Sequence, residues 1–249
     1  MTASPRNGER STVSPSPAGR LRLPRRLLRN PLVQLLIVAL LLTAIRLIVL
    51  QPYVVPSASM VPTLKVGDRI LVNRLSYRAS GPTRGDVVVF DGTGIWPSGP
   101  SAQGVRRLAQ QVGGLLGIGP SDRTILTKRV LAVGGDRISC CDNRGRVVRT
   151  EPGHPPVPLQ EPYVTDDFPF VPGEKDCAST PRSQRCFGPY RVPDGMVLLV
   201  GDNRRISDDA LTRCRAATAS KDCVRWVPAD RIVGKLLVTW WPLPRLRIW

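Results

Sequence analysis

The sequence contains a single histidine, His154, and only five lysines, although Lys and Arg together number 36. His154 lies in the Pro-rich string E-P-G-H-P-P, where no neighbouring motif gives it a catalytic partner. A Ser-His-Asp or Cys-His arrangement needs a usable histidine, and zinc sites commonly use one. The composition therefore argues against a histidine-based hydrolase and a zinc site, and it leaves few candidates for any lysine-based mechanism.

The six cysteines lack the CxxC spacing of many metal and redox sites, and all lie in the second half of the chain. Their even number permits full pairing in an oxidising compartment. Cys177 with Cys186, and Cys214 with Cys223, are equally spaced and suggest two local disulfides. The adjacent Cys140 and Cys141 can each pair elsewhere, because six cysteines allow 15 connectivities. Free buried thiols are the alternative.

Acidic residues are scarce: 19 Asp and Glu leave a net charge of +17. Such a charge suits nucleic acid or an anionic membrane surface. Residues 1–30 hold seven Arg and one Glu in a Ser/Pro/Gly-rich stretch that cannot build a core. We interpret residues 1–31 as a disordered basic tail. A nucleic-acid partner is disfavoured because this tail is short, lacks aromatic residues and adjoins an apolar segment.

That apolar segment, residues 32–50, reads LVQLLIVALLLTAIRLIVL. As a helix it would be about 28 Å long, close to the hydrocarbon thickness of a bilayer, so it predicts one N-terminal transmembrane helix. The arginines before it favour a cytoplasmic N-terminus and an extracytoplasmic domain over 51–249. A cleaved secretory signal is the alternative, but the following Q-P-Y-V-V-P is not a small-residue cleavage site.

Beyond residue 50, short Val/Ile/Leu runs alternate with Gly, Pro and Asp, which is typical of β-strands. Examples are G-D-R-I-L-V-N, R-G-D-V-V-V-F, K-R-V-L-A-V and G-M-V-L-L-V-G-D. Each Gly-Asp pair predicts a turn in which Asp bonds local backbone. With 25 Pro and 22 Gly arguing against a helical bundle, we expect a mostly β, antiparallel catalytic domain.

Two stretches interrupt these strands. Between Asp91 and Asp122 lies a Gly/Pro/Ser-rich insertion, whose residues 105–112 fit a short amphipathic helix. Residues 138–192 are rich in Pro and hold four cysteines. We predict that this second stretch forms an inserted, loop-rich, disulfide-containing subdomain.

Two residue types offer chemistry without histidine. The string P-S-A-S-M-V-P-T-L places Ser57 and Ser59 between two prolines on a restricted, extended segment. A serine needs a nearby group to take its proton, and an amine can do so only if desolvation lowers its pKa. In a strand, Lys128 would share one face with Leu126, Val130 and Ala132. Lys128 is thus the candidate base, the alternative being an ordinary edge or snorkelling lysine.

These strings occur in a set order. After the apolar segment come P-S-A-S-M-V-P-T-L, G-D-R-I-L-V-N, R-G-D-V-V-V-F, T-K-R-V-L-A-V-G-G-D and G-D-N-R-R-I-S-D-D. In this order they resemble the successive boxes of the bacterial type I signal peptidases, or leader peptidases, which use a Ser/Lys dyad. The resemblance covers most of 56–91, 127–136 and 197–209.

The resemblance implies Ser59 as the nucleophile and Lys128 as the general base. It gives Ser57 the hydroxyl that completes the oxyanion hole with the Ser59 N–H. Ser207 matches a serine that hydrogen-bonds and orients the lysine, while Asp209 matches a structural carboxylate. No metal and no cofactor is implied.

The remaining matches concern the substrate and the family's last box. Met60 and Pro62 match substrate-binding positions that set shape beside the nucleophile. The family continues its last box as S-x-D-S-R, whereas this chain has S-D-D-A-L. Asp209 therefore needs another cation, for which Arg213, Arg129 and Arg204 are the candidates.

Together with the predicted membrane segment, the resemblance implies an enzyme of the bacterial plasma membrane that removes signal peptides from exported preproteins. The expected partners are those preproteins and a bilayer with anionic lipids. The resemblance also implies a preference for small residues such as Ala one and three places before the cut. A Ser/Lys self-cleaving repressor would need a helix-turn-helix, which we do not find. A membrane-anchored cationic binding protein, in which Ser59 and Lys128 are incidental, is the other alternative.

Overall fold

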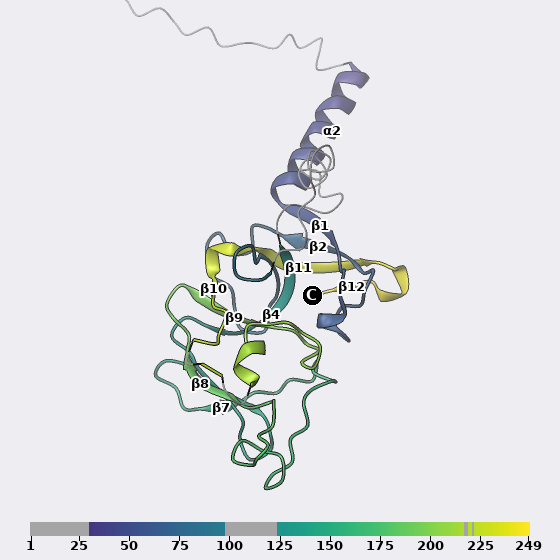
Figure 1. Cartoon of the computed structure of the whole chain (residues 1–249). Helices are drawn as coiled ribbons and strands as arrows, with labels where there is room; N and C mark the ends of the chain where they lie inside the picture. Colours follow the sequence, from purple (N-terminus) through teal and green to yellow (C-terminus); the bar gives the residue numbers. More distant parts are fainter. Residues whose placement is uncertain (1–29, 98–123, 217–218, 221) are drawn as a thin grey trace, which may run out of the picture. The chain divides into compact units, whose positions relative to one another are not determined.

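The computed structural model describes residues 30–97, 124–216, 219–220 and 222–249 (Figure 1). Residues 1–29 of the predicted basic tail and the helix expected at 105–112 lie outside these residues, whereas Pro31, the last residue assigned to that tail, already begins a helix. The chain divides into two units, Met1–Thr43 and Ala44–Trp249.

The first element is the helix α2, Pro31–Ile48. Asn30 caps it through its side-chain oxygen, which accepts the Leu32 N–H at 2.9 Å, and Pro31 occupies the first helical position. Large apolar side chains along it, such as Leu32 and Leu35, are exposed. Among the described residues, no helix combines the length and the apolar character needed to cross a membrane. The transmembrane helix expected over 32–50 is therefore not confirmed; the helix stops short, and Leu50 already begins a strand.

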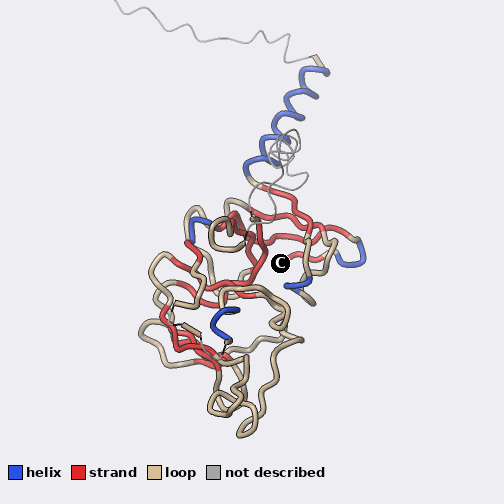
Figure 2. The backbone as a smooth tube through the Cα atoms, viewed as in Figure 1, coloured by secondary structure: helices blue, strands red, loops and turns tan. Residues whose placement is uncertain are grey.

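The larger unit is mostly antiparallel β-structure, as predicted (Figure 2). One sheet has the strand order β1-β2-β11-β3-β4-β9-β10, with β12 paired to β11. Its strands are β1 (Leu50–Val54), β2 (Arg69–Asn73), β3 (Val87–Asp91), β4 (Ile125–Val133), β9 (Met196–Val200), β10 (Val227–Pro228), β11 (Ile232–Trp241) and β12 (Arg247–Ile248). Every pairing in it is antiparallel. The four Val/Ile/Leu runs named above supply β2, β3, β4 and β9.

A second antiparallel sheet has the order β7-β6-β5-β8. Its strands are β5 (Arg137–Cys140), β6 (Val147–Thr150), β7 (Val157–Pro158) and β8 (Phe187–Arg191). The region expected to be loop-rich thus contains a small sheet as well as the long connection from β7 to β8. The described residues also form four short 3-10 helices: η1 (Ala58–Met60), η2 (Thr212–Arg215), η3 (Ala229–Arg231) and η4 (Leu243–Arg245).

The Gly-Asp turns repeat one arrangement three times. In each, glycine has a positive φ and the aspartate carboxylate accepts the backbone N–H of the residue three places before it, as the sequence predicts for such turns. These turns are Gly67-Asp68, Gly85-Asp86 and Gly135-Asp136. The fourth pair, Gly201-Asp202, is not of this type, because Gly201 has no positive φ.

A β-bulge in β4 changes its side-chain alternation. The register with β9 shifts between Val130 and Ala132. Leu126 and Val130 pack into one hydrophobic cluster with Val88 and Phe90. Ala132 instead joins a different cluster, which the second sheet shares. The prediction that Ala132 lies on the same face as Lys128 is therefore wrong, because a bulge interrupts the two-residue period of a strand.

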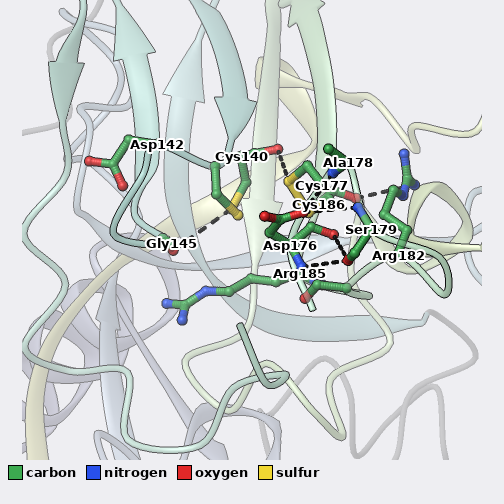
Figure 3. Close-up of a disulfide and its surroundings, with 12 residues drawn as sticks. Cys140, Asp142, Gly145, Asp176, Cys177, Ala178, Ser179, Arg182, Arg185 and Cys186 are labelled. Carbon is green, nitrogen blue, oxygen red and sulfur yellow. Dashed lines mark hydrogen bonds between the residues drawn. A yellow bond between two sulfur atoms is a disulfide. The ribbon is translucent and has the colours of Figure 1, made fainter. Parts of the chain in front are cut away.

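All six cysteines form disulfides: Cys177–Cys186 and Cys214–Cys223, as the spacing suggested, and Cys140–Cys141. Figure 3 shows Cys177 and Cys186 beside Cys140, whose carbonyl oxygen lies 3.6 Å from the Cys177 sulfur. The sulfurs of Cys141, Cys177 and Cys186 lie within 4.8 Å of one another. Each is already bonded to another sulfur, so this cluster offers no thiolate to a metal.

Candidate active site

The segment that carries the two candidate serines follows β1 and folds into η1. Ser57 is exposed, Ser59 is half-buried and Met60 is buried. The hydroxyl oxygens of Ser57 and Ser59 lie 3.3 Å apart. Met60 packs among Val55 and Leu64, so it anchors the segment in the core and holds Ser59 at its edge.

Lys128 lies in the middle of β4, opposite Val88 of β3. Its side chain is 3% exposed. Burial lowers the pKa of Lys128 to about 8, because a charged amine loses its hydration there. The negative charges of Asp209, Asp208 and Asp202 oppose this shift. Within the described part of the chain, no carboxylate forms an ion pair with the Lys128 amine.

Residues 201–209 contact both η1, which carries Ser59, and β4, which carries Lys128. The backbone N–H of Asn203 donates to the Ser59 carbonyl oxygen at 3.0 Å. A Cβ on Gly201 would lie 2.5 Å from that same oxygen and 2.2 Å from Ser207 Oγ. The strand β4 also contacts η1 directly. Ser59 and Ser207 therefore meet at Gly201, where only a residue without a side chain fits.

Asp202 cross-links the same two elements through its carboxylate. It accepts hydrogen bonds from Arg129 Nε at 2.8 Å and Nη2 at 2.7 Å, and a third from the hydroxyl of Thr63. Arg129 is the neighbour of Lys128 in β4, and Thr63 follows η1. Tyr163 covers this pair, with its ring centroid 3.9 Å from the Arg129 guanidinium carbon.

Ser207 and Asp209 are both buried. Ser207 Oγ has no hydrogen-bond partner among the described residues, so the bond to Lys128 that the resemblance implies is not formed here. Asp209 accepts the backbone N–H groups of Gly201 at 3.3 Å and Leu211 at 3.0 Å. It therefore braces both ends of the loop that carries Ser207.

The cation beside Asp209 is Arg215, whose Nη2 lies 3.5 Å from the carboxylate. None of the three arginines expected for this role takes it. Arg129 pairs with Asp202, and Arg204 pairs with Glu161 at 2.5 Å. Arg213 is exposed. The reason is the three-residue period of η2, which puts Arg215 on the side of Thr212, whose hydroxyl accepts the Asp209 N–H.

The two candidate substrate-binding residues, Met60 and Pro62, differ in burial. Met60 is inside the core, whereas Pro62 is exposed and lines a cavity of about 310 Å³ together with Thr63, Asp68, Arg245 and Trp249. His154 is exposed, and its ring Nδ1 lies 3.0 Å from the Pro152 carbonyl oxygen.

Several residues of the site were missed by sequence reasoning. Asp202 was interpreted only as a turn residue, and Asn203 acts through its backbone, which leaves no side-chain signal. Thr63, Tyr163 and Arg215 lie far from Lys128 in the sequence. The string G-D-N carries no signal for Asp202 either, because the absence of a positive φ at Gly201 is visible only in the structure.

A family model described as "Signal peptidase, peptidase S26" matches residues 28–241. The chain belongs to the peptidase S26 family. "Signal peptidase I" of Mycobacterium tuberculosis (strain CDC 1551 / Oshkosh) is 36% identical over 207 residues, covering 79% of this chain and 67% of that protein. "Probable signal peptidase I" of Mycobacterium leprae (strain TN) is also 36% identical, over 213 residues, covering 79% and 70%.

Among solved structures, a signal peptidase I from Enterococcus faecalis V583 matches 62% of this chain and 96% of that chain, with 18% identity and a TM-score of 0.33. A score this low adds nothing to the S26 assignment, which stands on the family model and the mycobacterial relatives.

Proposed function

We propose that this S26 peptidase removes N-terminal signal peptides from exported preproteins, with Ser59 as the nucleophile and Lys128 as the general base. The observation that carries the proposal is the buried Lys128 amine. It has no ion-pair partner among the described residues, and its pKa is lowered to about 8. A neutral amine is available near physiological pH only in such a site.

In the proposed reaction, the neutral Lys128 amine takes the Ser59 hydroxyl proton while Ser59 Oγ attacks the scissile carbonyl carbon. The Ser59 N–H and the Ser57 hydroxyl donate to the resulting oxyanion, and such donors stabilise the charge that develops in the transition state. The protonated Lys128 then gives its proton to the leaving amine. The neutral Lys128 amine then takes a proton from water as that water attacks the acyl carbon, and it returns this proton to Ser59 Oγ as the acyl bond breaks.

Two further residues support the base in this proposal. Ser207 has a buried hydroxyl with no partner among the described residues, so it is available to hydrogen-bond the lysine amine when Lys128 reorients. Asp209 fixes the loop that carries Ser207 through its two backbone hydrogen bonds. Its role is to hold the geometry rather than to exchange protons.

We further propose that the substrate binds as an added strand beside the first half of β4. The strand β9 pairs with β4 only from Arg129 to Val133, whereas β3 pairs with it from Ile125 to Arg129. Ile125–Lys128 thus have one edge without a strand partner among the described strands. An extended peptide on such an edge gains main-chain hydrogen bonds, while side-chain pockets give specificity. Met60 and Pro62 would shape those pockets for small residues such as Ala.

The peptidase is assigned to the bacterial plasma membrane, with the N-terminus cytoplasmic, the domain over 51–249 extracytoplasmic and segment 32–50 as its attachment. Five arginines between residues 20 and 29, the exposed apolar side chains of α2 and the three disulfides support this arrangement. Protease added outside intact spheroplasts should degrade the domain. A domain protected until the cells are lysed would contradict the assignment.

Contact with anionic lipid is part of the same proposal. The C-terminal segment exposes four large apolar side chains: Trp241, Leu243, Leu246 and Ile248. Arg247, in the same segment, is also exposed. Aromatic and basic side chains are typical of membrane interfaces. Vesicles with anionic lipid should bind the full chain in detergent-free flotation more than neutral vesicles do.

The deciding experiment is cleavage of a peptide with Ala one and three places before the scissile bond, by the detergent-solubilised full chain. Ser59→Ala and Lys128→Ala should each abolish cleavage while the fold persists. Ser80→Ala and Lys65→Ala, at exposed positions, are the matched controls and should cleave as the wild type does. Wild-type cleavage by either site variant would overturn the catalytic assignment, and no cleavage by the wild type would favour a binding protein.

A further inference from the structure

Three negatively charged carboxylates attract the Lys128 ammonium group, and each one raises the pKa of Lys128. They belong to Asp202, Asp208 and Asp209. Three uncompensated negative charges around a buried amine would favour its charged form and so oppose its use as a base. The structure therefore has to neutralise them, and each carboxylate has an arginine beside it.

Asp202 takes its arginine from β4 itself, through the two hydrogen bonds from Arg129. The arginines of the other two carboxylates come from a different part of the chain. Arg215 lies 3.5 Å from Asp209, and Arg225 Nη1 lies 2.5 Å from Asp208 Oδ1. Both arginine side chains are only 9% exposed. Such shielding strengthens their effect on nearby charges.

The Cys214–Cys223 disulfide brings these two arginines together. Arg215 follows Cys214, and Arg225 comes two residues after Cys223, with the two cysteine Cα atoms 5.0 Å apart. Both sulfur-bearing residues are buried. The Arg225 N–H donates to the Ala210 carbonyl oxygen at 3.0 Å, which ties the end of this loop directly to the residue after Asp209.

Each guanidinium is also held by contacts away from its carboxylate. Arg215 Nη1 donates to the Arg204 carbonyl oxygen at 2.7 Å, and its guanidinium carbon lies 5.1 Å from the Phe168 ring centroid. Arg225 lies over Trp96, at 5.4 Å from the ring centroid. These contacts fix the positive charges in place, as an isolated surface ion pair would not.

We propose that Arg215 and Arg225 are positioning residues of the peptidase: they neutralise Asp209 and Asp208 and thereby favour the uncharged form of the Lys128 amine, which accepts the Ser59 proton. The inference rests on the proposed Ser59 and Lys128 mechanism. The nearby charges not included are Arg129, which Asp202 neutralises, and Arg204, which pairs with Glu161. Val88, which faces Lys128 from β3, carries no charge.

The first test is the pH dependence of kcat/KM for the full chain in detergent. Arg225→Gln and Arg215→Gln should each move the acid limb to higher pH, by about one pH unit, because a carboxylate then acts unopposed on the lysine. Arg213→Gln removes the same charge from the same short helix but is exposed, so it should leave the limb in place. Arg225→Lys and Arg215→Lys keep the charge and should move the limb less.

A second variant pair separates charge from structure. Asp208→Asn in the Arg225→Gln background removes the carboxylate that Arg225 neutralises, so the acid limb should return to its wild-type position. A purely structural role for Arg225 predicts the opposite, since the double variant lacks both partners. The Asp208 side chain is about half exposed, at 49%. The Arg225→Gln and Asp208→Asn variants can therefore test the inference even if Arg215→Gln does not fold.

The third measurement does not depend on cleavage. In protein labelled with ¹³C at lysine Cε, Lys128 can be assigned by its absence from Lys128→Ala, because the chain has only five lysines. Its titration midpoint should rise in Arg225→Gln and stay unchanged in Arg213→Gln. If the Lys128 midpoint in Arg225→Gln is unchanged while the wild type cleaves the peptide, the inference is overturned and the proposed function still stands. A shifted midpoint in a protein that cleaves nothing would support the charge arrangement and refute the proposed function.

Discussion

The backbone N–H of Asn203 lies 3.0 Å from the carbonyl oxygen of Ser59 and donates a hydrogen bond to it. The candidate nucleophile is thus positioned by main chain from a segment far along the sequence. Gly201, two residues before Asn203, allows this approach because it has no side chain. The placement of Ser59 should therefore be sensitive to a single added methyl group.

Gly201→Ala should reduce kcat by about 100-fold, since a displacement on the order of 1 Å at a reacting group can cost that much. The added Cβ would lie 2.2 Å from Ser207 Oγ and 2.5 Å from the Ser59 carbonyl oxygen. Gly81→Ala is the matched control, because nothing lies within 4 Å of a Cβ there. Steady-state cleavage assays compare the two. An active Gly201→Ala enzyme would show that the loop can move away without consequence.

Burial of Lys128 should also affect stability. Its pKa falls from 10.5 to about 8 in the folded protein. Between these values the unfolded chain holds a proton that the folded chain has lost, so the free energy of unfolding rises with pH across that window. Below about pH 8 the buried charge costs roughly 3 kcal/mol. Lys128→Met should remove this cost.

Urea unfolding at pH 7 and pH 10 measures the effect. Lys128→Met should be more stable than the wild type at pH 7, and the difference should shrink at pH 10. Lys65→Met, at an exposed lysine, should show no such pH-dependent difference. In the same window, kcat/KM of the wild type should rise with pH around 8 as the amine becomes neutral. A flat profile there would exclude Lys128 as the base.

The ion pairs around the site should differ widely in their contribution to stability. Asp202→Asn breaks a buried pair and leaves Arg129 without its counter-charge, which should cost about 3–5 kcal/mol. Asp166→Asn removes the partner of Arg205 in an exposed pair 3.6 Å apart, which should cost less than about 1 kcal/mol. Chemical denaturation of both variants tests this ordering. Equal losses would mean that Arg129 finds another partner.

The sequence allowed the strands to be predicted because they depend on local pattern, whereas the candidate dyad required the order of several distant strings and the resemblance that they carry. Lys128 lies in the string I-L-T-K-R-V-L-A-V, which forms β4 with the amine buried. The side-chain alternation failed at Ala132, where a bulge depends on pairing with β9 and leaves no mark in the strand itself. The prediction of which arginine pairs with Asp209 was wrong for a similar reason. Arg215 faces it only because η2 turns with a three-residue period.

The two nine-residue disulfide spacings provide an internal comparison. Cys177–Cys186 and Cys214–Cys223 close loops of equal length, so loss of either should cost a similar chain entropy, about 2–3 kcal/mol. Cys214 and Cys223 are both buried in the core, whereas Cys177 is exposed. Paired Cys→Ser substitution should therefore lower Tm more at Cys214 and Cys223. Equal shifts would indicate that packing around the buried sulfurs adds little.

The strand order places β2 between β1, its predecessor in the chain, and β11, which is formed by residues 232–241. Until those late residues arrive, one edge of β2 lacks its partner, and unpaired edges invite association with other chains. Pairings between such distant residues are also slow to form. Because synthesis proceeds from the N-terminus, this edge of β2 stays open until nearly all of the 249 residues have been made.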